Sequence, residues 1–194
     1  RPDRQPDGAA VLSKLRLWAS EFGFSQIGVS GVDLHGAEPG LRAWLDAGFH
    51  GTMAYMAAHG MKRARPAELV QGTVSVVTAR MDYLPRDAAP AWVAAEWARL
   101  EDASQAAISI YARGRDYHKV MGRKLKELAE WITTASGAAS RTFVDTGPVL
   151  ERAWAERAGL YARVTETPAE LDDVVAALAQ KLASANPSAV RELK

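Results

Sequence analysis

The chain has 194 residues, of which 48% are hydrophobic and 24% charged, and its 24 basic and 23 acidic residues leave a formal net charge of +1. This composition is typical of a globular protein with one sizeable core, and it gives no global reason to expect a nucleic acid or a membrane as partner. Cysteine is absent, which excludes disulfides, thiol nucleophiles, cysteine-ligated zinc and cysteine-held iron–sulfur clusters on this chain.

The N-terminal half alternates helical and strand patterns. Apolar residues recur at helical spacing over Val11–Phe22, and the short apolar run Ser25–Ser30 predicts a strand. A second short helix is predicted around Leu41–Leu45. The Met-rich residues 51–66 fit either core filling or the wall of a pocket for a large flat ligand. Thr73–Thr78, which reads TVSVVT, is the clearest buried strand because β-branched residues dominate it.

The next eighty residues continue this alternation. Residues 86–103 are rich in alanine and predict a loose helical insertion, and Ala106–Tyr111 predicts a strand. Apolar residues at helical spacing over Met121–Ile132 predict a long helix. Thr142–Asp145 predicts a last short strand, which leads into a helix near Val149–Ala158. Alternating helices and strands favour an α/β or α+β core.

The last part of the chain has a helical pattern without predicted strands. Thr167, Pro168 and Glu170 occupy the N-cap, first and third positions of a capping box, and an apolar face follows over Leu171–Leu182. Asn186 and the proline after it predict the start of a second, shorter helix. We therefore expect a C-terminal helical tail.

Patterns of targeting and of metal binding are missing. No apolar run is long enough to span a membrane, and the polar start RPDRQPDG, residues 1–8, lacks the apolar core of a signal peptide. We expect a cytoplasmic, monomeric protein that has no membrane partner, and Arg1 in place of Met indicates a fragment of a longer reading frame. No protein-ligated metal is expected because the four histidines lack the spacing of a metal site: His35, His50, His59 and His118.

The densest local signal is a basic segment over residues 111–126, in which Asp116 is the only acid. On a helix, Arg115, Lys119 and Arg123 would stack at i+4 spacing. Two readings stay open for this segment, a solvated helix face and a site for the phosphates of a cofactor tail or of RNA. Its basic side chains are Arg113, Arg115, Lys119, Arg123, Lys124 and Lys126.

Asp145 ends an apolar run just before Thr146-Gly147-Pro148, where a turn can project a side chain into a crevice. A carboxyl group in such a place can serve as a general acid, although Asp145 could equally cap the helix that follows. Arg152, one turn into that helix, could be an ion-pair partner or a ligand contact. The chain contains no Walker loop, no GxGxxG and no GxSxG motif.

Three segments resemble a known family. They are residues 51–77, which contain MKRARPAELVQGTVSVV and are followed by RMDYLP; YARGRDYHKVMGRKLKELAEWI at Tyr111–Ile132; and FVDTGPVLERAWAERAGL at Phe143–Leu160. In order and spacing they are similar to the N-terminal half of the epoxyqueuosine reductases, the cobalamin-dependent enzymes that complete the queuosine base in tRNA. The resemblance covers most of residues 9–160.

The resemblance implies an α+β, nitroreductase-like cobalamin-binding domain over residues 9–160, with a small central sheet flanked by helices. It implies an oxidoreductase that reduces epoxyqueuosine to queuosine in tRNA. Asp145 matches the family's proton donor, and Arg152 matches an arginine that contacts the corrin. The remaining cofactor-binding residues implied by the resemblance are Tyr111, Arg113, Asp116, Tyr117 and His118, and no metal ligand is implied on the protein.

The resemblance breaks after Leu160. The family continues into a ferredoxin-like domain that holds two 4Fe-4S clusters, which cannot bind here because the chain has no cysteine. Reduction would therefore need an external electron donor, and the chain would be a truncated enzyme. Residues 161–194 resemble instead the terminal helices of an enoyl-CoA hydratase (crotonase) family protein. The alternatives are a corrinoid-binding module without turnover, and an inactive gene fragment whose pocket never closes.

Overall fold

The computed structural model describes residues 8–85, 87–145, 147–161 and 167–184. The chain divides into two compact units, Arg1–Leu160 and Tyr161–Lys194. The first unit is α+β, and its main elements are α1 (Gly8–Glu21), β1 (Gln26–Ser30), α2 (Glu38–Asp46), α3 (Ala54–Ala58), α4 (Pro66–Leu69), β2 (Val76–Arg80), α5 (Trp92–Glu101), α6 (Tyr117–Ser136) and α7 (Glu151–Arg157). Short 3-10 helices lie at η1 (His35–Ala37), η2 (Gly60–Ala64) and η3 (Ile110–Ala112).

The sheet of the first unit consists of β1 and β2, which pair antiparallel with Ile27 opposite Ala79 and Gly28 opposite Thr78. The prediction of β1 is confirmed. The second strand was predicted about three residues too early, since it begins at Val76, and Val74 is 80% exposed. Because successive side chains of a strand point to opposite faces, the two faces of this sheet carry different partners.

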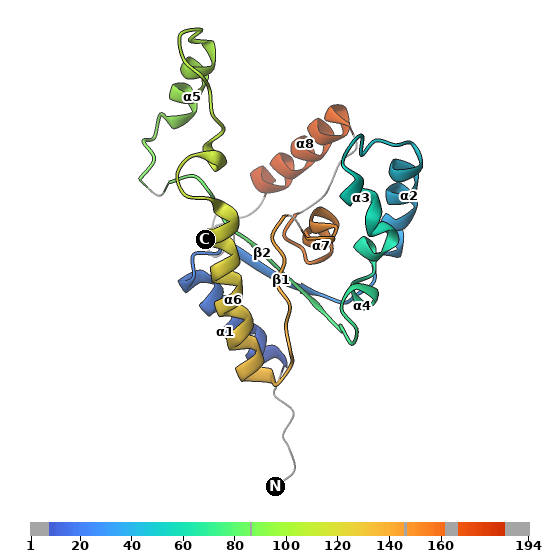
Figure 1. The fold of residues 1–194 in the computed structure, drawn as a ribbon. Helices are drawn as coiled ribbons and strands as arrows, with labels where there is room; N and C mark the ends of the chain where they lie inside the picture. The colour runs from blue at the N-terminus through green and yellow to red at the C-terminus, as the bar shows by residue number, and fades with distance from the viewer. Residues whose placement is uncertain (1–7, 86, 146, 162–166, 185–194) are drawn as a thin grey trace. The chain divides into compact units, whose positions relative to one another are not determined.

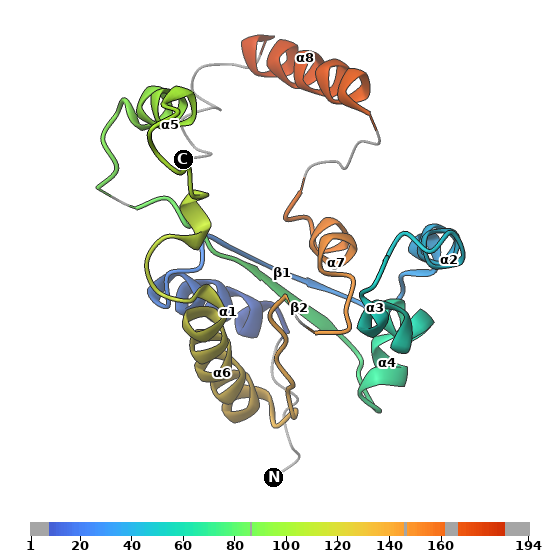
Figure 2. The same cartoon turned by 45° about the horizontal axis from the view of Figure 1, so that its top comes forward.

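One face of the sheet is covered by α1 and α6, which lie side by side beneath the strands in Figure 2. Their core contains Leu15, Ala19 and Leu128, with Ile27 of β1 packed against it. Gly23 ends α1: it adopts a left-handed φ of +84°, and the Phe24 N–H donates to the Ala19 carbonyl at 2.9 Å. This hydrogen-bond pattern is a Schellman motif, which needs glycine at the left-handed position.

The other face of the sheet is covered by α7, which contacts both strands (Figure 1). Trp154 of α7 is 3% exposed and joins a second core with Leu34, Leu41 and Ala64. Gly28 is required where β1 passes the end of α7, because a Cβ there would lie 2.3 Å from the carbonyl oxygen of Ala158. The helix predicted near Val149–Ala158 is confirmed.

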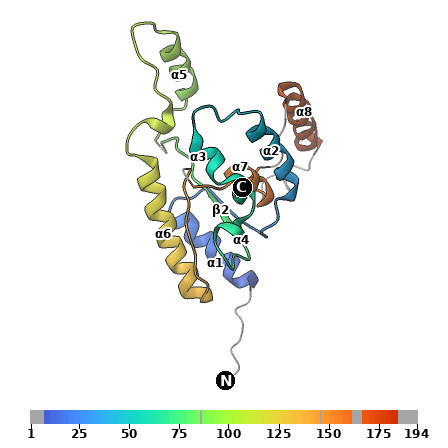
Figure 3. The same cartoon turned by 45° about the vertical axis from the view of Figure 1, so that its right-hand side comes forward.

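Two connections lead away from the sheet within the first unit. The link between the strands contains α2, α3 and α4, and the predicted short helix around Leu41–Leu45 is confirmed as part of α2. The predicted insertion over residues 86–103 contains α5, which extends away from the sheet beyond one end of α6 in Figure 3. Its side chains Trp97 and Leu100 are more than 60% exposed.

Two predicted strands are wrong. Ala106–Tyr111 runs irregularly into the 3-10 turn η3, and Ile108 is 57% exposed. Thr142–Asp145 does not form a strand either, and Asp145 at its end has a left-handed φ of +50° that no strand accommodates. Both segments have the right side chains for a strand, but within the described residues no neighbouring strand pairs with either of them.

The second unit contains α8 (Pro168–Ser184). Its predicted cap is confirmed, because the Glu170 N–H donates to the Thr167 hydroxyl at 3.2 Å. The helix predicted from Asn186 lies outside the described residues. Among the helices that the structure describes, none is long and apolar enough to cross a membrane.

Candidate functional site

Asp145 lies where the irregular 142–145 segment turns towards α7. Its φ of +50° is the one left-handed backbone among the described residues other than glycine, and such conformations concentrate at functional sites because they cost free energy. The N-cap of α7 is Leu150, five residues later, and no side chain caps that helix end. The helix-capping alternative for Asp145 is therefore wrong, and its carboxylate is available for other partners.

Two side chains from the first turn of α6 meet the Asp145 carboxylate. The Tyr117 hydroxyl donates a hydrogen bond to Asp145 Oδ2, and Nε2 of His118 lies 3.3 Å from the same oxygen. The backbone N–H of Asp145 donates to Oε1 of Glu151 at 2.6 Å. The site thus joins the N-terminus of α6 to that of α7, and the Asp145 side chain is still 57% exposed.

Contacts within the site shift the pKa values of Tyr117 and Glu151. The hydrogen bond to Asp145 raises the pKa of Tyr117 to about 12, so its hydroxyl remains a donor throughout the physiological range. Partial burial raises the pKa of Glu151, an effect that the Asp145 N–H opposes. The Tyr117 phenol and the Glu151 carboxyl group therefore flank the exposed Asp145 carboxylate.

Asp116 orients the histidine of the site. As the N-cap of α6 it accepts the His118 N–H at 3.0 Å, and its Oδ1 lies 3.2 Å from His118 Nδ1. Partial desolvation raises the pKa of Asp116, but these hydrogen bonds from His118 outweigh it and lower the pKa overall. The imidazole is consequently held between the carboxylates of Asp116 and Asp145.

A row of aromatic rings leads away from the carboxylate. The Tyr117 ring stacks on His118 with centroids 4.0 Å apart, and it meets Tyr111 edge-on at 5.8 Å. Tyr111 in turn meets Tyr83 at 6.2 Å. Tyr111 is 51% and Tyr83 66% exposed, so the row presents apolar ring surface to solvent. The sequence did not indicate Tyr83, because its place in the row depends on the Tyr111 ring, 28 positions later in the chain.

The other predicted site residues lie elsewhere. The Arg113 guanidinium binds both carboxylate oxygens of Glu96, at 2.8 and 2.5 Å, and thereby ties α5 to the segment before α6. Arg152 on α7 has no hydrogen bond or ion pair within the described residues. The expected stack of three basic side chains on one helix is wrong for Arg115, since α6 begins at Tyr117.

The basic segment serves more than one purpose. Lys124 donates to the Phe22 carbonyl and so fastens α6 to the end of α1, while Arg123 lies 4.0 Å from Glu127. Lys119 and Lys126 are exposed and have no hydrogen bond or ion pair to the part of the chain that the structure describes. Several exposed cations therefore lie near the N-terminal half of α6, including Arg115.

Arg63 was not distinguished by the sequence reasoning, although it is 5% exposed. Its guanidinium donates to the carbonyls of Tyr55 and Met56, at 2.9 and 3.0 Å, and so satisfies the C-terminal end of α3. A buried arginine without a carboxylate partner has no signature in the sequence. The Met-rich stretch is therefore folded around a buried cation, and Met61 packs against the core beside Trp154.

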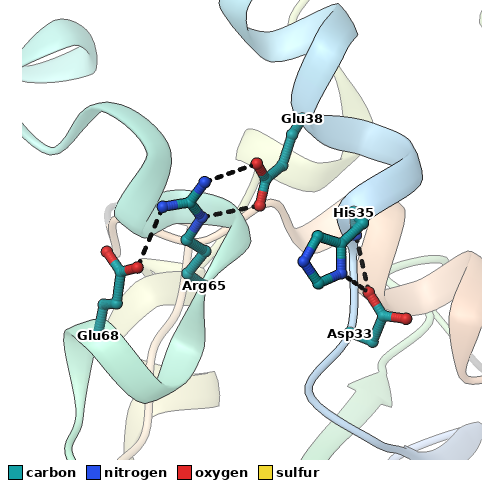
Figure 4. Close-up of polar contacts among 5 residues, drawn as sticks. All are labelled: Asp33, His35, Glu38, Arg65 and Glu68. Carbon is teal, nitrogen blue, oxygen red and sulfur yellow. Dashed lines mark hydrogen bonds and ion pairs between the residues drawn. The ribbon is translucent and has the colours of Figure 1, made fainter.

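A second polar cluster lies at the start of α2 (Figure 4). Arg65 binds Glu38 in a bidentate ion pair, with both nitrogen–oxygen distances 2.8 Å, and also reaches Glu68 at 3.1 Å. The imidazole and backbone N–H of His35 meet the Asp33 carboxylate. Hydrogen bonds from Arg65 lower the pKa of Glu38. These contacts fasten α2 to α4, and no group of three metal-ligating side chains occurs within the described ranges.

Comparison with known proteins shows what the chain is similar to. The family model described as Epoxyqueuosine reductase QueG, DUF1730 matches residues 63–146, a range that contains both Arg63 and Asp145. An epoxyqueuosine reductase of Alicycliphilus denitrificans is 57% identical over 150 residues, which are 77% of this chain and 42% of that protein. The proteins of the same name from Burkholderia pseudomallei and Escherichia coli are 51% and 47% identical over 179 and 151 residues.

The Burkholderia match spans 86% of this chain and 44% of that relative. The Escherichia match spans 77% of this chain and 38% of that relative. It thus spans about two fifths of the length of the curated relatives that it matches. No solved structure matches the chain significantly.

Proposed function

The chain carries an N-terminal segment of the epoxyqueuosine reductases, a family of oxidoreductases, and from this premise we propose that it holds cobalamin for the reduction of epoxyqueuosine to queuosine in tRNA. The observation that carries the proposal is the geometry of Asp145. Its exposed carboxylate is held in a left-handed turn next to the Tyr117 hydroxyl, the His118 imidazole and an open row of tyrosine rings. We also propose that the fold of residues 9–160 is related to that of nitroreductase-like cobalamin proteins.

The described residues suit one wall of a corrin site. Exposed aromatic surface at Tyr83 and Tyr111 can pack against a flat macrocycle, and Arg152 on α7 is free to donate to its amide groups. Bound cobalamin would supply the strongly reducing centre that the reaction needs. Asp145 lines neither of the two cavities beside α1, and its side chain is 57% exposed.

In the proposed reaction, two electrons and two protons convert the epoxide to an alkene and release its oxygen as water. The exposed Asp145 carboxylate takes up a proton from solvent and passes it to the departing oxygen, while its contacts with Tyr117 and His118 hold the carboxyl group in position. The exposed cations of α6 and the segment before it, Lys119 and Arg115 among them, would bind tRNA phosphates. Because these 194 residues have no cysteine to hold an iron–sulfur cluster, the proposal takes the electrons from a donor outside them.

Cobalamin binding is tested by mixing the chain with hydroxocobalamin and following its visible absorption through gel filtration. We expect the cofactor to elute with the protein. Tyr111→Ala should weaken binding because it removes exposed ring surface from the row, whereas Tyr161→Ala, which removes a similarly exposed ring outside it, should not. A cofactor that elutes wholly apart from the protein contradicts the proposal.

The role of Asp145 is tested with Asp145→Asn, since asparagine also tolerates the left-handed backbone. We expect this variant to bind cobalamin normally and to lose turnover of epoxyqueuosine tRNA by a factor of about 10² to 10⁴ when a chemical reductant supplies the electrons, the range typical of general acid catalysis. Asp87→Asn is the control, because Asp87 is exposed and outside the site. Unchanged turnover in Asp145→Asn removes Asp145 from the mechanism.

The absence of cysteine favours one second candidate, a corrinoid-binding module without turnover. It predicts the same co-elution with cobalamin but no reduction of epoxyqueuosine under any chemical reductant. The origin of residues 161–194 in a crotonase-like protein stays a prediction.

A further inference from the structure

A groove runs along β1 on the side away from β2. It has a volume of about 430 Å³, and its floor is formed by residues 24–29, the strand and the two residues before it. One wall consists of α1 side chains, including Leu12, Arg16 and Ser20, and the other consists of residues 158–160. Within the described residues β1 pairs with β2 alone, so the edge of β1 that faces the groove carries backbone groups without a sheet partner.

The walls of the groove are extensions of the two layers that cover the sheet. Beside β2, the sheet is covered by α1 and α6 on one face and by α7 on the other. Beside β1, the same two layers extend past the strand, since α1 supplies one wall and the end of α7 the other. The space between them has the position of a third strand. Val29, a β-branched residue of β1, is 42% exposed at this edge.

We propose that the groove receives an extended polypeptide segment that pairs with β1 as a third strand, and that this segment belongs to the part of an epoxyqueuosine reductase that the present chain does not match. Two observations identify the occupant. The chain spans 42% of the Alicycliphilus relative, so most of such a protein is unrepresented here. The groove also has residues 158–160 as a wall, and these are the last residues of the first unit.

The groove dictates the chemistry of its occupant. Main-chain hydrogen bonds to β1 would supply much of the affinity, as in other cases of strand addition. Side chains pointing to α1 meet Leu12 and Ala19, and those on the opposite face meet Leu160, so small or branched apolar residues suit both. Arg16 at the rim favours an acidic residue nearby. This inference rests on the family relationship and is independent of cobalamin binding.

Overlapping synthetic peptides that cover the unmatched part of the Alicycliphilus relative provide the probe. Each is mixed with the whole chain, and deuterium exchange is measured for the backbone amides of Gln26–Ser30. We expect one peptide to bind and to slow exchange in β1. Ser20→Arg, which places a long charged side chain in the groove, should weaken binding of that peptide about tenfold or more, because a built-in clash rejects a ligand.

Ser13→Arg is the matched control, since Ser13 is exposed on the same helix and lines neither cavity. It should bind the peptide as the unmodified chain does, and circular dichroism should show both variants folded. Three results overturn the proposal: no peptide slows exchange in β1, Ser20→Arg binds with unchanged affinity, or exchange in β1 slows with rising chain concentration alone. The last result would assign the groove to a second copy of this chain.

Discussion

Gly28→Ala tests the packing of α7 across the sheet. Gly28 lies at the middle of β1, opposite Thr78, and the atoms nearest to an added Cβ belong to Ala158 and Leu160, which follow α7. The added Cβ would lie 2.3 Å from the Ala158 carbonyl oxygen and 2.6 Å from Cδ1 of Leu160. Leu160 can shift its methyl group, but the carbonyl oxygen belongs to the backbone and moves only with the end of α7.

The cost follows from this close approach. Overpacking that forces a backbone shift costs about 1–3 kcal/mol. For a chain of this length, each 1 kcal/mol lowers the Tm by roughly 2–4 °C, so we expect a decrease of about 2–12 °C. If the shift also moves the start of α7, where Glu151 holds the Asp145 N–H, the turnover proposed above should fall in the variant as well.

Thermal unfolding followed by circular dichroism measures the effect, and Gly31→Ala is the control. Gly31 follows β1 directly, has open space around its Cα and no left-handed φ. Its replacement should leave the Tm unchanged or raise it slightly, because alanine has fewer unfolded conformations to lose. Equal Tm values for Gly28→Ala and the unmodified chain would refute the packing of α7 against β1.

Three further predictions address the core, the buried arginine and the site. Leu128→Ala should destabilise the chain by about 2–5 kcal/mol in urea titration, because Leu128 is 2% exposed at the centre of the α1–α6 core and its loss leaves a cavity. Arg63→Met should cost about 1–3 kcal/mol in the same assay because two buried carbonyls lose their donor, whereas Lys62→Met, an exposed neighbour, should cost little; equal effects would contradict the buried role. The hydrogen bond to Asp145 raises the pKa of Tyr117 from 10.0 to about 12, so its stabilising effect should be complete below pH 10 and lost as the pH rises towards 12. Comparison of the unmodified chain with Tyr117→Phe by pH-dependent urea unfolding and phenolate absorbance checks this, and a Tyr117 that ionises near pH 10 would refute the contact.

The helices were predictable because their signals are local. Periodic apolar residues and a terminal glycine marked α1, and the Thr167 cap with proline after it marked α8. A helix satisfies its own backbone hydrogen bonds, so its sequence carries most of the information that it needs. The position of α6 was predicted in the same way, although the cap that begins it, Asp116, was interpreted as a cofactor contact.

Strands depend on partners that lie far along the chain. The 106–111 and 142–145 segments have the side chains of strands but no pairing strand within the described residues, and they are irregular. β1 has the same kind of sequence and does form a strand, because β2 lies beside it. Side-chain pattern alone cannot distinguish these cases, since the backbone hydrogen bonds of a strand are made to another segment.

For this protein, the sequence by itself determined the longer helices, the absence of cysteine chemistry and the resemblance that singled out Asp145, but not the short helices α3 and α4. The tertiary structure decided what surrounds that carboxylate. Tyr117 and His118 reach Asp145 from 28 and 27 positions earlier in the chain, and Arg63 is buried against the carbonyls of another helix. Such contacts depend on how α6, α7 and the sheet pack together, and no local pattern of residues records that arrangement.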